Sequence, residues 1–376
     1  MYAATQRHIV AFERCLQRAV ARIRKEMSVE GFLPEQLEQL LNLREAIHNP
    51  RKNGLATLRQ CSLSGSPQPE PWLEAVRSQV GGFPVVVRCA REKSSGILRT
   101  EREFRQWFIR NSTINHRSEY VVQEYVEDGH EFTALCTAKG GLVACIASVE
   151  THRTILECIQ SQLPFAMQLF SVEQTRDHLP GVESFATQVI KATFSKGYKG
   201  AIFIKGFYKD HNDIFFLGFA LEPESETLRT LLSMSRSLTP WETVVIESHY
   251  DVNDNLQNGH AATPLMHHCI INFPTAEGVL IHQTSIPRRP TSQMRVSWRC
   301  AEGQEMSDSI NIDDNVAQVY LSNMDHSNLI REAQDIMRNT DITIDRNVLL
   351  DRHSVCRRNM SRLNPRELIR SCTTAD

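Results

Sequence analysis

A cation and a run of small residues follow an apolar, strand-like segment in the first third of the chain. Arg88 stands near the end of this segment, Lys93 follows, and Ser94, Ser95 and Gly96 come next. Small residues after a strand expose backbone N–H groups, which bind anions together with nearby cations. The pattern predicts an anion site. Away from a strand, a Ser-Ser-Gly sequence is usually an ordinary turn, and Arg88 also fits a surface position at a strand edge.

Two carboxylates, Glu222 and Glu224, flank Pro223 after a later apolar run, and Asp210 and Asp213 lie shortly before it. Carboxylate oxygens are ligands that Mg²⁺ prefers, so this group is a candidate metal site. The alternative is a charged turn that opens a helix at Pro223, where the helix dipole favours acidic residues. The local sequence favours this alternative.

Amphipathic helices are predicted at the start of the chain. Apolar residues recur at helical spacing over residues 9–27, with polar residues on the other face. A second helix is expected to begin at Pro34 and to stop at Asn49-Pro50. The Ser-, Pro- and Gly-rich stretch 61–71 predicts an exposed connection.

Helical and strand patterns then alternate, which predicts an α+β fold with mainly antiparallel pairing. The turn at 209–213 lies between two apolar runs and predicts a hairpin, because Asn and Asp tolerate turn geometry. Segments 151–180 and 285–297 carry no readable motif and are predicted as loops. The expected helices are 72–80, 101–109, 183–194, a helical region from 224 to about 249, and 328–337; the expected strands are 83–89, 120–126, two within 130–149, 201–208, 214–221, 268–273, 278–284, 317–321 and 342–344.

The order of these segments resembles the ATP-grasp superfamily, the ATP-binding fold of carboxylate–amine and dipeptide ligases, over roughly residues 50–345. Segments 82–90 and 91–96 are similar to the strand and small-residue loop that contact the ATP phosphates in that family. Segment 121–131 resembles the connection between the two lobes, and strands 200–205 and 214–220 resemble those that carry the magnesium ligands. The segments 267–284 and 310–344 are similar to the closing subdomain of amino-acid and dipeptide ligases.

The resemblance implies an ATP-grasp fold in which two α+β lobes clasp a nucleotide cleft. The expected parts are an N-terminal helical segment (1–55), the small lobe and hinge (56–132), the large lobe with a closing subdomain (133–345) and a polar C-terminal tail (346–376).

The resemblance also implies ATP and Mg²⁺ as cofactors. Ligases of this fold phosphorylate a carboxylate and let an amine displace the acyl phosphate, while cations neutralise the transferred group. Arg88 stands at the family's phosphate-contacting Lys, with Lys93, Ser94, Ser95 and Gly96 in the phosphate loop. Glu124 and Val126 would offer backbone groups to adenine, Glu131 would bind ribose, and Arg153 is a candidate catalytic residue. For Glu131 and Arg153 the alternative is an exposed polar residue at a strand end.

The sequence departs from the family at the metal positions. Lys205, Gly218 and Ala220 fall where magnesium-binding residues are expected, and none of them can coordinate Mg²⁺. A four-residue slip would place Glu222 and Glu224 in those roles. It also lengthens the strand beyond its hairpin partner, which disfavours it. The metal motif is therefore degenerate, with Glu222 and Glu224 as the best remaining acidic ligands.

Composition limits the remaining function classes. The formal charge of −2 provides no overall basic field, no apolar stretch is long enough to span a bilayer, and the ten cysteines show no Cys-x-x-Cys pair. These features predict a cytoplasmic protein with buried free thiols that binds a nucleotide and possible small acid and amine substrates, without nucleic acid or membrane partners. Oligomerisation stays open. An Arg-rich C-terminal stretch gives a nucleic-acid or membrane adaptor little support.

Two functions follow. The first is an ATP-dependent carbon–nitrogen ligase. The alternative is a catalytically inactive pseudo-ligase that keeps the fold as a nucleotide-binding or protein-interaction scaffold.

Overall fold

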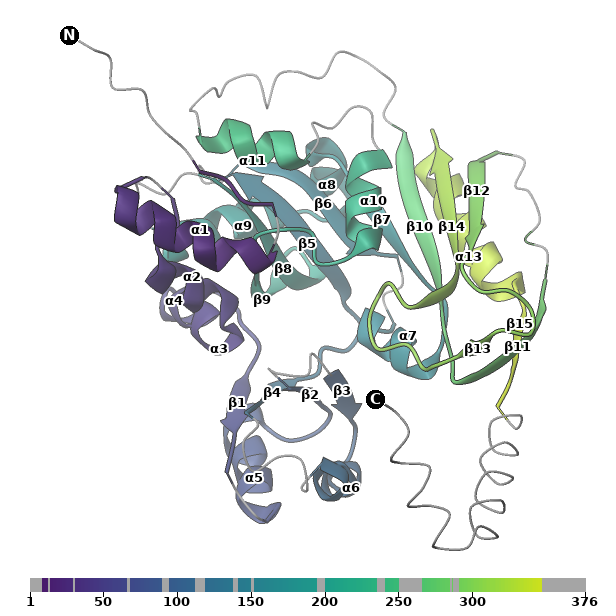
Figure 1. Cartoon of the computed structure of the whole chain (residues 1–376), viewed down its shortest axis with the longest axis horizontal. Coiled ribbons are helices and arrows are strands. Elements are labelled where there is room, and N and C mark those ends of the chain that lie inside the picture. Colours follow the sequence, from purple (N-terminus) through teal and green to yellow (C-terminus); the bar gives the residue numbers. More distant parts are fainter. Residues whose placement is uncertain are drawn as a thin grey trace, which may run out of the picture.

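A computed structural model of the chain has a small lobe built on one sheet and a larger body built on two sheets (Figure 1). It describes residues 9–12, 14–29, 31–65, 68–89, 95–111, 119–137, 141–149, 152–194, 200–234, 241–249, 266–284, 286 and 291–346. The mixed architecture agrees with the expected α+β class. No helix in these ranges is long and apolar enough to cross a membrane.

Short helices occupy the N-terminal segment: α1 (Arg14–Met27), α2 (Pro34–Leu41), α3 (Leu43–Ala46) and α4 (His48–Lys52). The expected single helix over 9–27 is wrong at its start, because Phe12 packs edge-on against Trp241 at 5.6 Å outside the helix. The expected stop at Pro50 is also wrong. Pro50 is buried in the first turn of α4, where the missing N–H of proline costs nothing.

The small lobe is a four-stranded sheet in the order β1-β4-β2-β3, and its apolar face packs on three helical segments. Trp72, Phe104 and Phe108 fill this core. The exposed connection expected over 61–71 is wrong in its first part, because Cys61 and Leu63 are buried in β1 and pair with β4. The elements are β1 (Gln60–Leu63), α5 (Glu70–Ala75), the π-helical turn η1 (Val76–Val80), β2 (Val85–Cys89), β3 (Ser95–Leu98), α6 (Glu101–Asn111) and β4 (Tyr120–Glu124).

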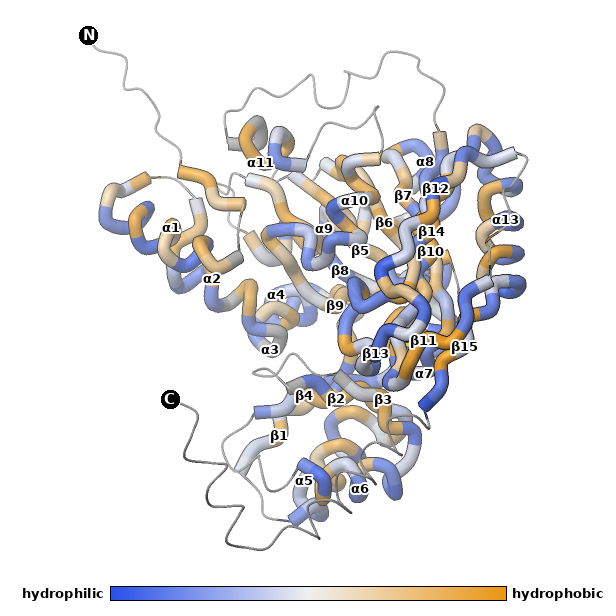
Figure 2. Tube along the Cα trace, turned by 45° about the vertical axis from the view of Figure 1, so that its right-hand side comes forward, coloured by the Kyte–Doolittle hydropathy of each residue, from blue (hydrophilic) through white to orange (hydrophobic). Residues whose placement is uncertain are grey.

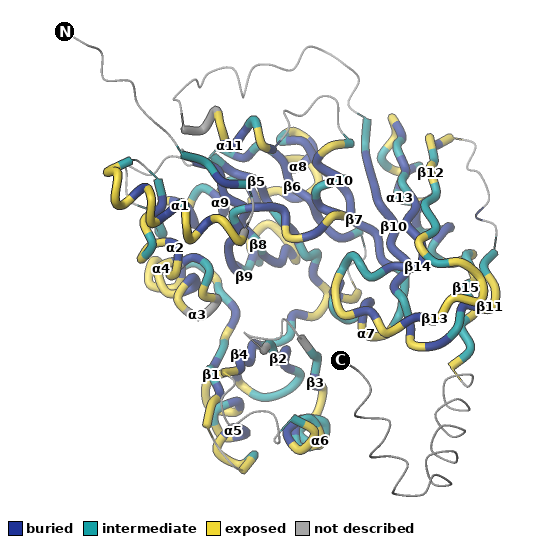
Figure 3. The backbone as a smooth tube through the Cα atoms, viewed as in Figure 1, coloured by how far each residue is buried: buried dark blue, intermediate teal, exposed yellow. Residues whose placement is uncertain are grey.

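The large body is centred on an eight-stranded sheet in the order β12-β14-β10-β7-β6-β5-β8-β9, in which every neighbouring pair is antiparallel. Its inner strands β6, β7 and β10 are buried almost throughout and are mostly hydrophobic (Figures 2 and 3). The strands are β5 (His130–Thr137), β6 (Leu142–Ser148), β7 (Phe165–Phe170), β8 (Ala201–Asp210), β9 (Asp213–Ala220), β10 (His267–Pro274), β12 (Gln293–Trp298) and β14 (Asn315–Asn323).

Helices cover both faces of this sheet, so the strand side chains form two separate cores. One face packs against α7 (Ile155–Ser161), α10 (Glu226–Met234) and α11 (Trp241–His249). The other packs against α8 (Val172–His178), α9 (Val182–Thr193) and α13 (His326–Asn339). We call these the α10 face and the α13 face. The free thiols of Cys136, Cys145 and Cys269 are buried in the sheet, as expected.

A small third sheet, in the order β13-β11-β15, lies beside the open edge of the large sheet. It consists of β11 (Gly278–Gln283), β13 (Glu305–Met306) and β15 (Ile342–Asp345). Gly278 has a positive φ of 146°, and a Cβ there would lie 2.7 Å from the Asp345 carbonyl oxygen. Only glycine therefore fits this close approach of the two strands.

Candidate functional site

Four charged side chains from both lobes form one cluster between them. Arg88 comes from β2 of the small lobe, whereas Glu131 and Lys205 come from β5 and β8 of the large sheet. Thr133 pairs with Lys205 in the sheet, so Glu131, two residues along β5, lies on the same face as Lys205. Glu224 joins them from the segment after β9 through an ion pair with Lys205.

Arg88 is held in this cluster by the small lobe. Its Nε donates to Gln123 Oε1 at 3.0 Å, and Gln123 Nε2 donates to Gln60 Oε1 at 2.9 Å. Burial lowers the pKa of Arg88, and the carboxylates of Glu131 and Glu224 oppose that shift. An Arg guanidinium stays protonated in proteins, so the small lobe presents a partly desolvated cation to the cleft.

Lys205 lies at the position where the ATP-grasp resemblance implies a metal ligand. It pairs across the hairpin with Gly218, while Phe203 pairs with Ala220. Lys205 Nζ is 2.8 Å from Glu224 Oε2, and its side chain is 25% exposed. The strand β9 ends at Ala220, as the unshifted alignment requires. An ammonium–carboxylate pair therefore stands where the resemblance implies a metal site.

The second candidate metal ligand, Glu222, is buried and paired with another cation. Its Oε2 accepts from Arg229 of α10 at 3.4 Å. Asp210 accepts from the Asn212 N–H inside the hairpin turn, at 2.8 Å. Within the described ranges, no group of three or more His, Cys, Asp or Glu side chains has a geometry that could hold a metal ion.

The residues proposed for ribose and adenine lie between the end of β4 and the start of β5. Glu131 Oε1 accepts the Ile155 N–H at the start of α7, at 2.8 Å, and burial raises its pKa. Glu124 accepts from the backbone and side chain of Arg59, at 2.7 and 2.6 Å. Val126 is buried in a small cluster with Leu58 and Phe207, and its backbone N–H donates to no other described residue. Glu131 is thus not the solvated strand-entry residue of the alternative interpretation.

The remaining candidate residues are those of the predicted phosphate loop and Arg153. Lys93 and Ser94 lie outside the described residues, and of Ser95 only the backbone is described. Gly96 lies within β3, where a Cβ would meet Gln160 of α7 at 3.5 Å. Arg153 is exposed and makes no hydrogen bond or ion pair to another described residue.

A buried polar network on the α10 face is absent from the sequence predictions. Gln318 of β14 donates to Asn272 of β10 at 2.8 Å and to Thr227 of α10 at 2.9 Å, and Arg299 donates to Gln318 at 2.6 Å. Asn272 Nδ2 is buried without a partner among the described residues. Asn272 and Gln318 are isolated polar residues in apolar strands, and that signal identifies buried polar positions before the structure is known.

Solved structures show the same fold at low sequence identity. An L-amino acid ligase from Bacillus licheniformis matches with a TM-score of 0.63 and 11% identity over 89% of this chain and 80% of the ligase. Phosphoribosylglycinamide synthetase from Anaerococcus prevotii matches with a TM-score of 0.52 and 15% identity, covering 87% and 80% of the two chains. N5-carboxyaminoimidazole synthase from Aspergillus clavatus, solved with ADP and 5-aminoimidazole ribonucleotide, matches with a TM-score of 0.56 and 9% identity, covering 86% and 79%.

No protein-family profile matches the sequence, and a search of curated proteins finds no match. The solved structures confirm the expected ATP-grasp fold. At 9–15% identity they establish the fold alone.

Proposed function

We propose that this chain is a ligase-like ATP-grasp protein that binds a nucleotide without magnesium and does not catalyse the metal-dependent ligation. The observation that carries this proposal is the Lys205–Glu224 ion pair, which forms opposite Gly218 in the strand hairpin. The ammonium group provides the positive charge that a magnesium ion provides in an active ligase, but it cannot bridge phosphate oxygens by coordination.

Electrostatics opposes a magnesium ion beside Lys205. Two like unit charges about 4 Å apart repel by ~4 kcal/mol near a protein surface, and a dication doubles this value. The carboxylates that would offset the repulsion are occupied, because Glu224 is paired with Lys205 and Glu222 with Arg229.

Three groups remain for a nucleotide. Lys205 has three N–H donors and uses one on Glu224, so it retains donors for a phosphate oxygen. Arg88 faces the same space from the other lobe and can pair with phosphate as a planar fork. The backbone N–H of Val126 donates to no other described residue and lies between β4 and β5, where the ATP-grasp resemblance implies adenine contacts.

Thermal unfolding with ATP in EDTA and with ATP in excess MgCl₂ tests this proposal. A ligand that binds only the native state raises the unfolding temperature, so we expect equal rises under both conditions. Lys205→Met should remove most of the rise, whereas Lys209→Met, at the exposed end of the same strand, should preserve it. A rise that requires magnesium, or no rise with ATP at all, would contradict the proposal.

An active ligase is the competing candidate. Glu222 and Glu224 favour it, because they lie two residues apart at the edge of the cleft and would be released if their cation partners moved. This function predicts ADP release that requires an acid and an amine together with MgCl₂. Mixtures of amino acids assayed for ADP distinguish the two functions, and acid- and amine-dependent release would establish the ligase.

A further inference from the structure

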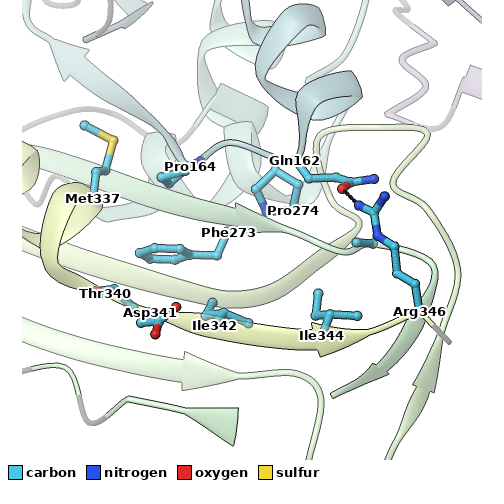
Figure 4. Close-up of a pocket in the computed structure, with 11 residues that line it drawn as sticks. Gln162, Pro164, Phe273, Pro274, Met337, Thr340, Asp341, Ile342, Ile344 and Arg346 are labelled. Atoms are coloured by element: carbon cyan, nitrogen blue, oxygen red, sulfur yellow. Dashed lines mark hydrogen bonds between the residues drawn. The ribbon is translucent and has the colours of Figure 1, made fainter. Parts of the chain in front are cut away.

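A cavity of about 320 Å³ lies outside the nucleotide cleft, between the C-terminal end of α13, strand β15 and the end of β10 (Figure 4). Phe273 and Met337 belong to its wall and also to the core of the α13 face. Lys205 and the polar network around Gln318 lie on the α10 face instead. The large sheet therefore separates this cavity from the proposed nucleotide site.

Strand β15 and the residues on either side of it line the cavity with side chains that change from polar through apolar to cationic. Side chains alternate along a strand, so Ile342 and Ile344 of β15 point to the same side, and Thr340 and Arg346 flank the strand before and after it. All four line the cavity. The series runs from a hydroxyl through two apolar side chains to a cation, and Figure 4 shows Arg346 at one end of the cavity and Met337 at the other.

Apolar side chains line the middle of the cavity. Phe273, Pro274 and Ala276 are buried, and Pro164 continues the same wall from the segment before β7. A ligand in this trough would replace water on these surfaces, at a gain of about 25 cal/mol for each Å² of apolar area buried.

Arg346 is an exposed side chain at the cationic end, where it takes part in a chain of hydrogen bonds. Arg346 donates to Gln162 Oε1, while Gln162 Nε2 donates to Asp308 at 2.8 Å. The guanidinium has five N–H donors, and the bond to Gln162 leaves a pair for the two oxygens of a carboxylate. Asp341, the acidic residue that lines the cavity, lies toward the opposite end from Arg346 (Figure 4).

The far end holds an unused polar group. Thr340 Oγ1 is buried and has no hydrogen-bond partner among the described residues. A buried hydroxyl without a partner costs free energy, which a polar group or a water carried in by a ligand would recover.

We propose that this cavity binds a small carboxylic acid with an apolar chain, its carboxylate on Arg346 and its chain along Ile344 and Ile342 toward Met337. Strand β15, from Ile342 to Asp345, is roughly 10 Å long at the ordinary rise of a strand, a span that suits a medium-length chain of about eight carbons. This site is independent of the nucleotide proposed for the cleft.

Calorimetric titration of the full chain with octanoate, octylamine and octan-1-ol tests the site. The three probes share a chain length and differ in the charge of the head group. We expect octanoate to bind at a ratio of one to one, octan-1-ol to bind roughly ten- to hundredfold more weakly, and octylamine not to bind, because only octanoate pairs with Arg346.

Arg346→Gln should weaken octanoate binding roughly ten- to hundredfold and leave octan-1-ol binding unchanged. Ile344→Ser should weaken both probes, because it removes apolar wall. Arg331→Gln, on the exposed side of α13, is the matched control and should change neither. Octanoate binding that survives Arg346→Gln, equal binding of octylamine, or no heat with any probe would overturn the proposal.

Discussion

Lys205 changes the chemistry of its strand position without changing the fold around it. It remains in register with Gly218, and its long side chain reaches Glu224, which lies beyond the end of β9. The pair is part-buried, with exposed fractions of 25% and 38% for the two side chains. Loss of Lys205 therefore leaves the Glu224 carboxylate without its ammonium partner, and the negative charge can then attract a metal ion.

The substitution Lys205→Asp tests whether carboxylates at this position attract a metal ion. Two adjacent carboxylates repel each other, so we expect the free energy of unfolding to fall by about 1–3 kcal/mol. Excess MgCl₂ should restore much of the loss, because the two carboxylates then provide oxygen ligands. Chemical unfolding with and without MgCl₂ measures both effects.

Lys209→Asp is the control for that experiment, since Lys209 is exposed at the end of the same strand. Its stability should not respond to MgCl₂. If magnesium stabilises Lys205→Asp no more than it stabilises Lys209→Asp, the two carboxylates do not form a cation site and the substitution reports only repulsion.

Three elements of the α13 face meet through histidine rings. His178 ends α8, His267 begins β10 and His326 begins α13, and the ring centres of His178 and His326 are 4.0 Å apart. Burial and the neighbouring histidines lower the pKa of His326 to about 4, with Asp325 opposing the shift, and burial also lowers the pKa of His267.

These shifts predict that stability decreases in mild acid. The unfolded chain takes up the protons near the ordinary histidine pKa of about 6.5, whereas the folded chain accepts one on His326 only near pH 4. The unfolded state therefore binds more protons in this window, and the free energy of unfolding falls as pH drops from about 6.5 toward 4. Urea unfolding at intervals across the window measures the slope.

The variant His326→Gln keeps an amide donor for Gln168 Oε1, which His326 Nε2 contacts at 3.0 Å, and removes the titrating group. We expect a shallower pH dependence than in the natural chain. His48→Gln, on exposed α4, should leave the slope unchanged. Equal slopes in all three proteins would show that the histidine contacts do not govern acid stability.

The sequence predicted the secondary structure well where the residues that pair lie close together in the chain. The hairpin of β8 and β9 was predicted from two apolar runs around a turn of Asn and Asp, and the two strands pair as expected. The loops expected over 151–180 and 285–297 are wrong, because α7, β7, α8 and β12 lie there. β7 pairs with β10, about a hundred residues away, as well as with β6, and β12 pairs with β14, about twenty to thirty residues away.

The candidate site around Lys205 could be predicted from the sequence to the same extent as the fold. The prediction that Lys205, Gly218 and Ala220 stand at metal positions that they cannot fill follows from the sequence of one hairpin. The partners of those residues do not, because Arg88 comes from another lobe and Glu131 is held by the start of α7. The network of Gln318, Asn272 and Thr227 joins three elements far apart in sequence, so only the sheet order reveals it.

Helix α7 of the large body forms polar contacts with the small lobe. Glu157 accepts from Arg99 at 2.6 Å and from the Tyr125 hydroxyl, and Gln160 accepts the Ile97 N–H at 3.2 Å. Burial and the Glu157 carboxylate raise the pKa of Tyr125 to about 12, so Tyr125 donates at neutral pH. These polar contacts of α7 help to position the small lobe, together with the Arg88 cluster and the packing of Leu58 and Val126 on Phe207.

Glu157→Gln should loosen the lobes while leaving each lobe folded. The substitution removes the charge that strengthens both bonds, so we expect faster amide hydrogen exchange in β3 and α7 and an overall loss of about 1 kcal/mol or less. Glu101→Gln is the matched control. Glu101 also contacts two side chains, because it forms ion pairs with Arg77 and Arg105, but both partners lie within the small lobe. The Glu101→Gln substitution should speed amide hydrogen exchange in α6 without affecting exchange in α7. If both variants give the same exchange pattern, or if Glu157→Gln leaves α7 unchanged, the contacts of Glu157 do not set the position of the small lobe.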